Sequence, residues 1–76
     1  MTDINRLKIV FFERKKTSKW LADALKKDPA TVSKWCTNAS QPSISTFIEI
    51  AKLLDVELTE LFSESVLNIK QQNKFN

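Results

Sequence analysis

Apolar residues recur three or four positions apart along most of this chain, with polar and charged residues between them. That spacing is typical of amphipathic α-helices, each with one face turned towards a core. Positions 9–12 could also form a strand, but no alternating segment elsewhere offers it a partner, so we interpret them as helical. The pattern predicts an all-α fold of five helices, at about residues 3–15, 18–26, 29–36, 43–55 and 58–63.

The first predicted helix begins after Thr2 or Asp3, since either residue can cap it. Four adjacent apolar residues at positions 9–12 cannot all face one core, so we expect Ile9 or Phe12 to remain partly exposed. The core face of this helix is expected to consist of Ile4, Leu7, Val10 and Phe11.

The fourth predicted helix starts at Pro42-Ser43 and ends at Asp55. Its apolar positions, and those of the short fifth helix, are Ile44, Phe47, Ile48, Ala51 and Leu54, then Leu58, Leu61 and Phe62. These helices predict one domain over residues 1–63. Residues 64–76 are polar with scattered apolar side chains, and we expect them to be a partly disordered C-terminal tail.

Two short helices with a tight polar turn between them are predicted over residues 21–38. Asp28 followed by Pro29 signals the second helix, because Asp can accept hydrogen bonds from first-turn amides and Pro is tolerated at the first helical position. On this helix Val32 can bury together with either Trp35 or Cys36. The outward face is expected to carry Ala30, Ser33, Lys34 and Thr37. Small, hydroxyl and basic side chains on a short helix after a tight turn suit the floor of a DNA major groove.

The charge distribution agrees with a nucleic-acid partner. The net charge is +3, but residues 1–40 carry nine Lys/Arg against four Asp/Glu, whereas residues 41–76 carry three lysines against five acids. Positive charge is therefore concentrated in the half that contains the predicted turn between helices.

The absent residue types exclude most enzyme classes. The chain has no histidine, no glycine and one cysteine, so a nitrogen/sulfur metal site, a nucleophile–histidine pair and a Gly-rich phosphate loop are not expected. We therefore expect no catalytic activity, no metal and no cofactor. No apolar run is long enough to cross a membrane or resembles a signal peptide, which predicts a soluble, cytoplasmic protein.

Three sequence strings together resemble the XRE/Cro-type, phage-repressor-like helix-turn-helix family over about residues 4–62. They are LADAL from Leu21, TVSKW from Thr31, and PSISTFIEIAKLLDV from Pro42. The resemblance implies a five-helix bundle that binds operator DNA as a two-fold dimer. Three residues depart from the family pattern: Lys26 stands where a turn glycine is usual, Cys36 where an acidic residue is usual, and Lys16 where an apolar residue is usual.

The resemblance also implies roles for individual residues. It assigns base reading to the start of the third helix, at Pro29, Ala30, Ser33 and Lys34. Phosphate contacts are assigned to Thr17 and Ser18 at the start of the second helix, and to Asn38 after the third.

The residue chemistry fits these roles. Lys34 can donate to guanine O6 and N7, Ser33 can bond either kind of base, and Ala30 can meet a thymine methyl group. At the start of the second helix, free amides, hydroxyls and Lys19 can hold a phosphate. Thr31 can reach a phosphate or cap locally. Asn38 is also the residue best able to end a helix in a left-handed conformation without glycine.

The sequence therefore predicts a DNA-binding transcriptional regulator, a repressor that acts as a homodimer on a palindromic operator in double-stranded DNA. Half-sites would lie about 34 Å apart. Two alternatives remain open at this point. One is an antitoxin-type regulator that also holds a partner protein through its tail. The other is a protein-interaction module without DNA binding, which would dock through Phe12 and the region from the fifth helix to the tail.

Overall fold

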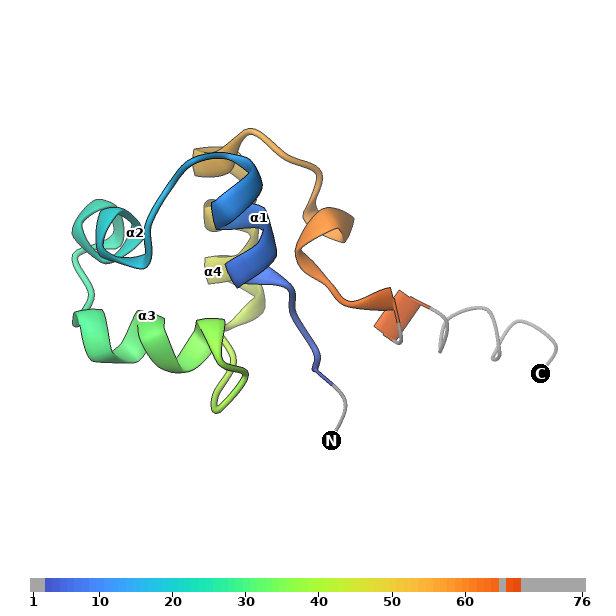
Figure 1. Ribbon diagram of the computed structural model, residues 1–76, viewed down its shortest axis with the longest axis horizontal. Coiled ribbons are helices and arrows are strands. Elements are labelled where there is room, and N and C mark those ends of the chain that lie inside the picture. Colours follow the sequence, from blue (N-terminus) through green and yellow to red (C-terminus); the bar gives the residue numbers. More distant parts are fainter. Residues whose placement is uncertain (1–2, 65, 68–76) are drawn as a thin grey trace, which may run out of the picture.

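The computed structural model describes residues 3–64 and 66–67 as a helical domain (Figure 1). Its elements are α1 (Leu7–Glu13), α2 (Ser18–Leu25), α3 (Pro29–Cys36), α4 (Ile44–Leu54) and the 3-10 helix η1 (Leu58–Leu61). α2 and α3 lie on one side of α1 and α4, and η1 lies on the other (Figure 1). The all-α prediction is confirmed for the described residues.

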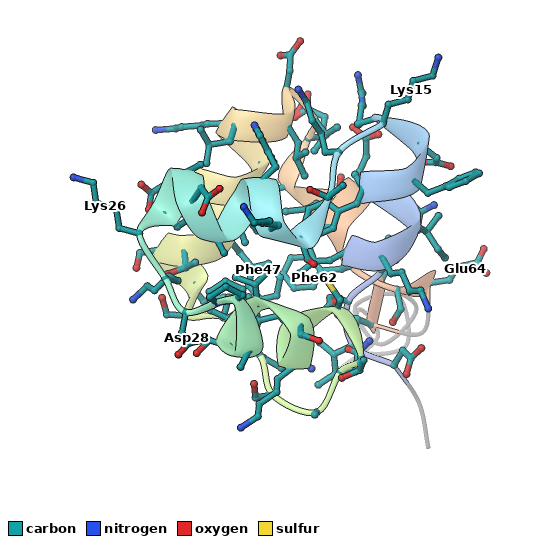
Figure 2. All side chains as sticks on the ribbon, turned by 60° about the vertical axis from the view of Figure 1, so that its left-hand side comes forward. Lys15, Lys26, Asp28, Phe47, Phe62 and Glu64 are labelled. Atoms are coloured by element: carbon teal, nitrogen blue, oxygen red, sulfur yellow. The ribbon has the colours of Figure 1, made fainter. Side chains whose placement is uncertain are left out.

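The core forms where the apolar faces of all five elements meet. Phe47 of α4 contacts Phe62, which follows η1, with ring centroids 4.8 Å apart, and both rings lie inside the molecule (Figure 2). Burying one side chain of this size stabilises the fold by about 1.5–3 kcal/mol. The buried apolar residues are Leu7, Val10, Phe11, Leu21, Ala22, Val32, Trp35, Phe47, Ile50, Ala51, Leu54 and Leu61.

The predicted count of five α-helices is wrong within the described residues, where four α-helices are followed by the 3-10 helix η1. η1 has only four residues, and a capping box between Glu57 and Glu60 closes it tightly, with the Glu57 amide donating to Glu60 Oε2 at 2.7 Å. Phe62 then turns to an extended conformation and cannot continue the helix. The predicted element at residues 58–63 is therefore present but shorter, and of a tighter type.

α1 also begins later than predicted. Residues 3–6 are not helical, and Asn5 forms an isolated antiparallel bridge with Phe62. The Arg6 amide donates to the Leu61 carbonyl at 2.9 Å, and the Ser63 amide donates to the Ile4 carbonyl at 2.8 Å. Pairing with a distant segment outweighs the local helical pattern here. Ile4 is consequently 43% exposed, so its prediction as a core residue is wrong.

Several apolar residues predicted to line the core side of a helix are exposed. Ile9 and Phe12 are both exposed on α1, where only one of them was expected to be. On α4, Ile44 and Ile48 are 64% and 41% exposed, whereas Ile50, which widens the apolar face that the spacing predicts, is buried. Helical spacing identifies an apolar face but does not define where neighbouring elements stop covering it.

Among the described residues, four adopt the left-handed conformation that glycine usually supplies, and all lie at or just after the end of an α-helix. Lys26 (φ 56°) ends α2, which confirms that the turn after this helix accepts a side chain. Asn38 (φ 64°) and Asp55 (φ 57°) follow the ends of α3 and α4 as predicted, and Lys15 (φ 58°) follows α1. Lys15 and Lys26 have no polar group near the backbone that would favour this conformation.

The predicted boundary at residue 63 and the partly disordered tail remain predictions, because residues 65 and 68–76 lie outside the described part of the chain. Among the helices that the structure describes, none has the length and apolar character to cross a membrane.

Candidate nucleic-acid interface

α2, the turn after it and α3 form one unit whose two helix starts are capped by side chains. Thr17 Oγ1 accepts a hydrogen bond from the Trp20 amide at 3.0 Å, and Asp28 Oδ1 accepts one from the Ala30 amide at 2.9 Å. Pro29 occupies the first turn of α3. Lys26 and Asp28 flank the turn at the edge of the molecule (Figure 2). The cap predicted at Asp28 is confirmed and fixes where α3 begins, and Thr17, not Ser18, caps α2.

α3 has one buried face and one exposed face, as predicted. Val32 and Trp35 are buried against α1 and α2, whereas Cys36 is half-buried. Thr31 is also half-buried, at the margin between the two faces. The exposed residues of this helix and its C-cap are Pro29, Ala30, Ser33, Lys34 and Thr37. Four of these are the residues assigned to base reading, and they share a single face.

The start of α2 brings the predicted phosphate-binding residues together. Thr17 and Lys19 are exposed, and Ser18 is half-buried. Lys19 Nζ lies 3.8 Å from the Asp23 carboxylate, but both side chains are more than 70% exposed. Such exposed pairs contribute little to stability, so Lys19 remains available to another anion.

Lys16 packs with its ammonium group over the ring of Trp20, 4.9 Å from the centroid. A cation over an indole face is attracted by the negative potential of the ring. This contact explains how the chain accommodates a lysine where related sequences usually have an apolar residue: the side chain covers Trp20 while its charge stays at the surface.

A hollow of about 410 Å³ joins the start of α2 to the exposed face of α3. Ser18 lines it from α2, and Ser33 and Thr37 line it from the other side. Lys8 and Lys16 add two ammonium groups. Both lysines come from α1 and the connection after it, and Phe11 and Phe12 of α1 form the apolar part of the lining. Two ammonium groups beside the hydroxyls of α2 and α3 suit a phosphate backbone.

Asn38 differs from the other predicted phosphate-binding residues, because its side chain is used within the protein. Its Oδ1 accepts hydrogen bonds from the amides of Ile4 and Asn5 at 3.0 and 2.9 Å. Its Nδ2 donates to the Asn5 carbonyl at 3.1 Å. Gln41 Nε2 donates to the same Oδ1 at 3.1 Å. Both ends of the carboxamide are therefore engaged.

Asn5 is the residue that the sequence interpretation missed. It is 2% exposed and is the only buried polar residue among those described. An asparagine shortly before a helix is an ordinary capping signal, and Asn5 Oδ1 does accept from the Leu7 amide at 3.0 Å. Its other partners lie more than thirty positions away in the sequence, at Trp35 and Gln41, and no local pattern marks them.

Cys36 is a poor nucleophile in this fold. Burial raises the pKa of its thiol, and the nearby positive charge of Lys8 lowers it by less. The thiol is therefore kept protonated near neutral pH. Within the described residues no group of three or more His, Cys, Asp or Glu side chains could hold a metal ion.

Comparison with known proteins agrees with this geometry. The family model described as helix-turn-helix matches residues 13–61, from the end of α1 to the end of η1. The crystal structure of a candidate DNA-binding protein from Bacteroides fragilis superimposes with a TM-score of 0.78 at 40% sequence identity, covering 79% of this chain and 97% of that chain. A search of curated proteins finds no match. On the family match and this structural likeness, the chain belongs to the XRE-type helix-turn-helix family of DNA-binding regulators.

Proposed function

We propose that this protein is a transcriptional repressor that binds a palindromic operator as a homodimer, with α3 of each copy in the major groove. The observation that carries the proposal is the exposed face of α3, where Ala30, Ser33 and Lys34 stand together on a helix whose start is fixed by Asp28. Side chains on the first turns of such a helix are those that reach base edges.

Each residue on this face has a distinct role in the proposal. Lys34 donates to guanine O6 and N7 or to a phosphate, and Ser33 bonds a neighbouring base. Ala30 and Pro29 lie at the start of α3, where small apolar surfaces can approach a thymine methyl group. Each good contact to a base contributes about 1–3 kcal/mol of discrimination.

Phosphate contacts come from Thr17, Ser18 and Lys19 at the start of α2, and from Thr31 on α3. Thr17 Oγ1 accepts from the Trp20 amide, so its contribution is the hydroxyl proton, which can donate to a phosphate oxygen. Asn38 is occupied by hydrogen bonds to the N-terminal segment. We therefore reassign Asn38 from a phosphate contact to a support for α3.

A homodimer follows from the small size of the reading element. α3 has eight residues and is about 12 Å long, which limits one copy to a few base pairs. Two copies related by a two-fold axis would read two half-sites about 34 Å apart and combine their binding free energies.

The test is a fluorescence-anisotropy titration of the full chain against a pool of random duplexes at low and high salt, followed by sequencing of the bound fraction. Enrichment of a palindrome, with two chains per duplex by analytical ultracentrifugation, is the expected result. Salt-sensitive binding without enrichment would mean that the protein contacts phosphates but does not read sequence. Absence of binding would overturn the proposed function. A reporter gene placed behind the recovered operator then shows whether the protein represses or activates transcription. Expression of the reporter should fall when the protein is supplied.

One observation favours a second function, binding of a partner protein. Phe12 is 84% exposed on α1, and Ile9, three positions earlier, is 51% exposed. Such a pair could serve an antitoxin-type regulator or an interaction module.

If the chain is an interaction module alone, Lys34→Ala leaves its cellular activity unchanged while Phe12→Ser removes it. The tail through which an antitoxin would hold its partner lies mostly outside the described residues.

A further inference from the structure

A cluster of three amide side chains, Asn5, Asn38 and Gln41, connects the N-terminal segment to the end of α3. Asn5 Nδ2 donates to the Trp35 carbonyl at 3.0 Å and to Gln41 Oε1 at 2.7 Å. The Trp35 carbonyl belongs to the last turn of α3 and also accepts from the Asn38 amide at 3.1 Å, so Asn5 is its second donor. Asn5 therefore binds the reading helix directly, at the end opposite to Asp28.

The side chain of Asn38 completes this connection by pairing with the backbone of Asn5. Its Oδ1 accepts from the Asn5 amide, and its Nδ2 donates to the Asn5 carbonyl. The carboxamide thus acts as a neighbouring strand would, satisfying both backbone groups of one residue. Glycine would adopt the left-handed conformation of Asn38 more easily, but it could make neither of these bonds.

The N-terminal segment is itself held from its other side. Its backbone pairs with Leu61 and Ser63, through the Arg6 amide and the Ile4 carbonyl. The segment therefore lies between the end of η1 and the end of α3. A buried, fully bonded polar connection of this kind favours one arrangement of the elements over others.

We propose that Asn5 and Asn38 are positioning residues for DNA reading: they fix the C-terminal end of α3 relative to the rest of the domain and thereby set which bases Ser33 and Lys34 meet. The effect on base reading rests on the proposed function, whereas the hydrogen bonds of Asn5 and Asn38 do not depend on it. α3 is short, and its start is fixed by Asp28. Releasing its far end would let the helix tilt in the groove without removing any side chain that touches DNA.

Two variants and one matched control test the proposal. Asn38→Gly keeps the left-handed backbone and removes the carboxamide. Asp55→Gly makes the same exchange after α4, at a residue with nearly the same φ, and serves as the control. Asn5→Asp keeps the acceptor for the Leu7 amide and removes the donors to Trp35 and Gln41. Since Asn5→Asp buries a carboxylate and risks unfolding, Asn38→Gly is the primary variant.

The first measurement is the ratio of affinities for the selected operator and for duplexes with one half-site base pair changed. Asn38→Gly is expected to lower this ratio about tenfold, which is the effect of one good base contact. Its affinity for random duplex should stay within about twofold, because the phosphate contacts remain. A parallel loss of both affinities, or an unchanged ratio in folded Asn38→Gly, would overturn the proposal.

The second measurement needs no DNA and separates this inference from the proposed function. Hydrogen exchange is followed at the amides of Thr37 and Ala39, which bond carbonyls of α3, and at Lys27, which bonds α2. Asn38→Gly should speed exchange at Thr37 and Ala39 about tenfold and leave Lys27 unchanged, since only the end of α3 opens locally. Asp55→Gly should change none of them. If the wild type binds no duplex, the proposed function fails, and hydrogen exchange alone tests whether Asn38 holds the end of α3. Unchanged exchange at Thr37 and Ala39 in Asn38→Gly would overturn the positioning role.

Discussion

Among the side chains proposed to read bases, Lys34 is the only charged one. It lies on the exposed face of α3, and its neighbours Ser33 and Ala30 are too short to prevent close approach to a groove. A lysine in this position can bind a guanine edge or a phosphate, and the two roles differ in their consequences for specificity.

Lys34→Ala is expected to weaken operator binding by about 1–3 kcal/mol and to relax the preference at one base pair of each half-site. Anisotropy titrations against the operator and its single-base variants measure both effects. Lys52→Ala, at an exposed lysine of α4, is the matched control and should change neither. Equal weakening on every duplex would assign Lys34 to a phosphate instead.

Lys26 illustrates a residue whose backbone, more than its side chain, matters for the fold. Its φ of 56° costs a non-glycine residue about 1–2 kcal/mol, of which the greater freedom of unfolded glycine would offset about 0.5–1 kcal/mol. Lys26→Gly should therefore raise the free energy of unfolding by about 0.5–1 kcal/mol, measured by urea denaturation. Lys27→Gly, one position later, lacks this benefit and should be neutral or destabilising.

At the scale of elements, the position of α3 depends on contacts at its two ends. Asp28 bonds the Ala30 amide at the start, and Asn5 bonds the Trp35 carbonyl near the end. Side chains at both ends satisfy backbone groups that an isolated eight-residue helix would leave to water. The helix is consequently held as a rigid presenting surface, although it is too short to be stable alone.

Asp28→Ala removes the cap at the start of α3 and should lower the free energy of unfolding by about 1 kcal/mol. Asp28→Asn retains an oxygen for the Ala30 amide and should lose less than half as much. Thermal and urea unfolding of the two variants provide the comparison. If Asn and Ala destabilise equally, the charge of Asp28 and not its hydrogen bond stabilises the helix.

At the scale of the whole molecule, charge is divided between the two halves of the chain. Lys8 of α1 and Lys16 of the α1–α2 connection line the hollow between α1, α2 and α3, whereas three acids, Asp55, Glu57 and Glu60, and one lysine, Lys52, line a different hollow beside α4 and η1. This separation orients the domain with its positive side towards DNA before any specific contact forms.

Salt should therefore weaken operator binding steeply. If a dimer neutralises about four to six phosphates, its affinity should fall about 100- to 1,000-fold between about 50 and 200 mM salt. Lys19→Ala should reduce the slope of log affinity against log salt by about 2, one unit for each copy. Titrations at four salt concentrations measure the slope, with Lys52→Ala again as the control. A slope that Lys19→Ala leaves unchanged would remove Lys19 from the phosphate contacts.

Much of this arrangement could be predicted because its signals are local. Caps at Thr17 and Asp28, the left-handed positions of Asn38 and Asp55, and the buried face of α3 all follow from residue type and helical spacing within a few positions. The exposed face of α3 follows from the same spacing, although its contacts with DNA remain predictions.

What the sequence determined by itself was therefore the existence of the four α-helices, their inward faces and the turn chemistry that separates them, since each depends on interactions between near neighbours. Three features came from tertiary packing: Ile4 stays outside the core, η1 is a short 3-10 helix, and Asn5 and Asn38 join the N-terminal segment to the end of α3. The exposure of Ile4 and the pairing of Asn5 with Asn38 depend on hydrogen bonds between segments more than thirty residues apart, which the chain can form only after the helices have packed. A residue pattern shows which face of a helix is apolar, but the element that packs against this face depends on the whole fold.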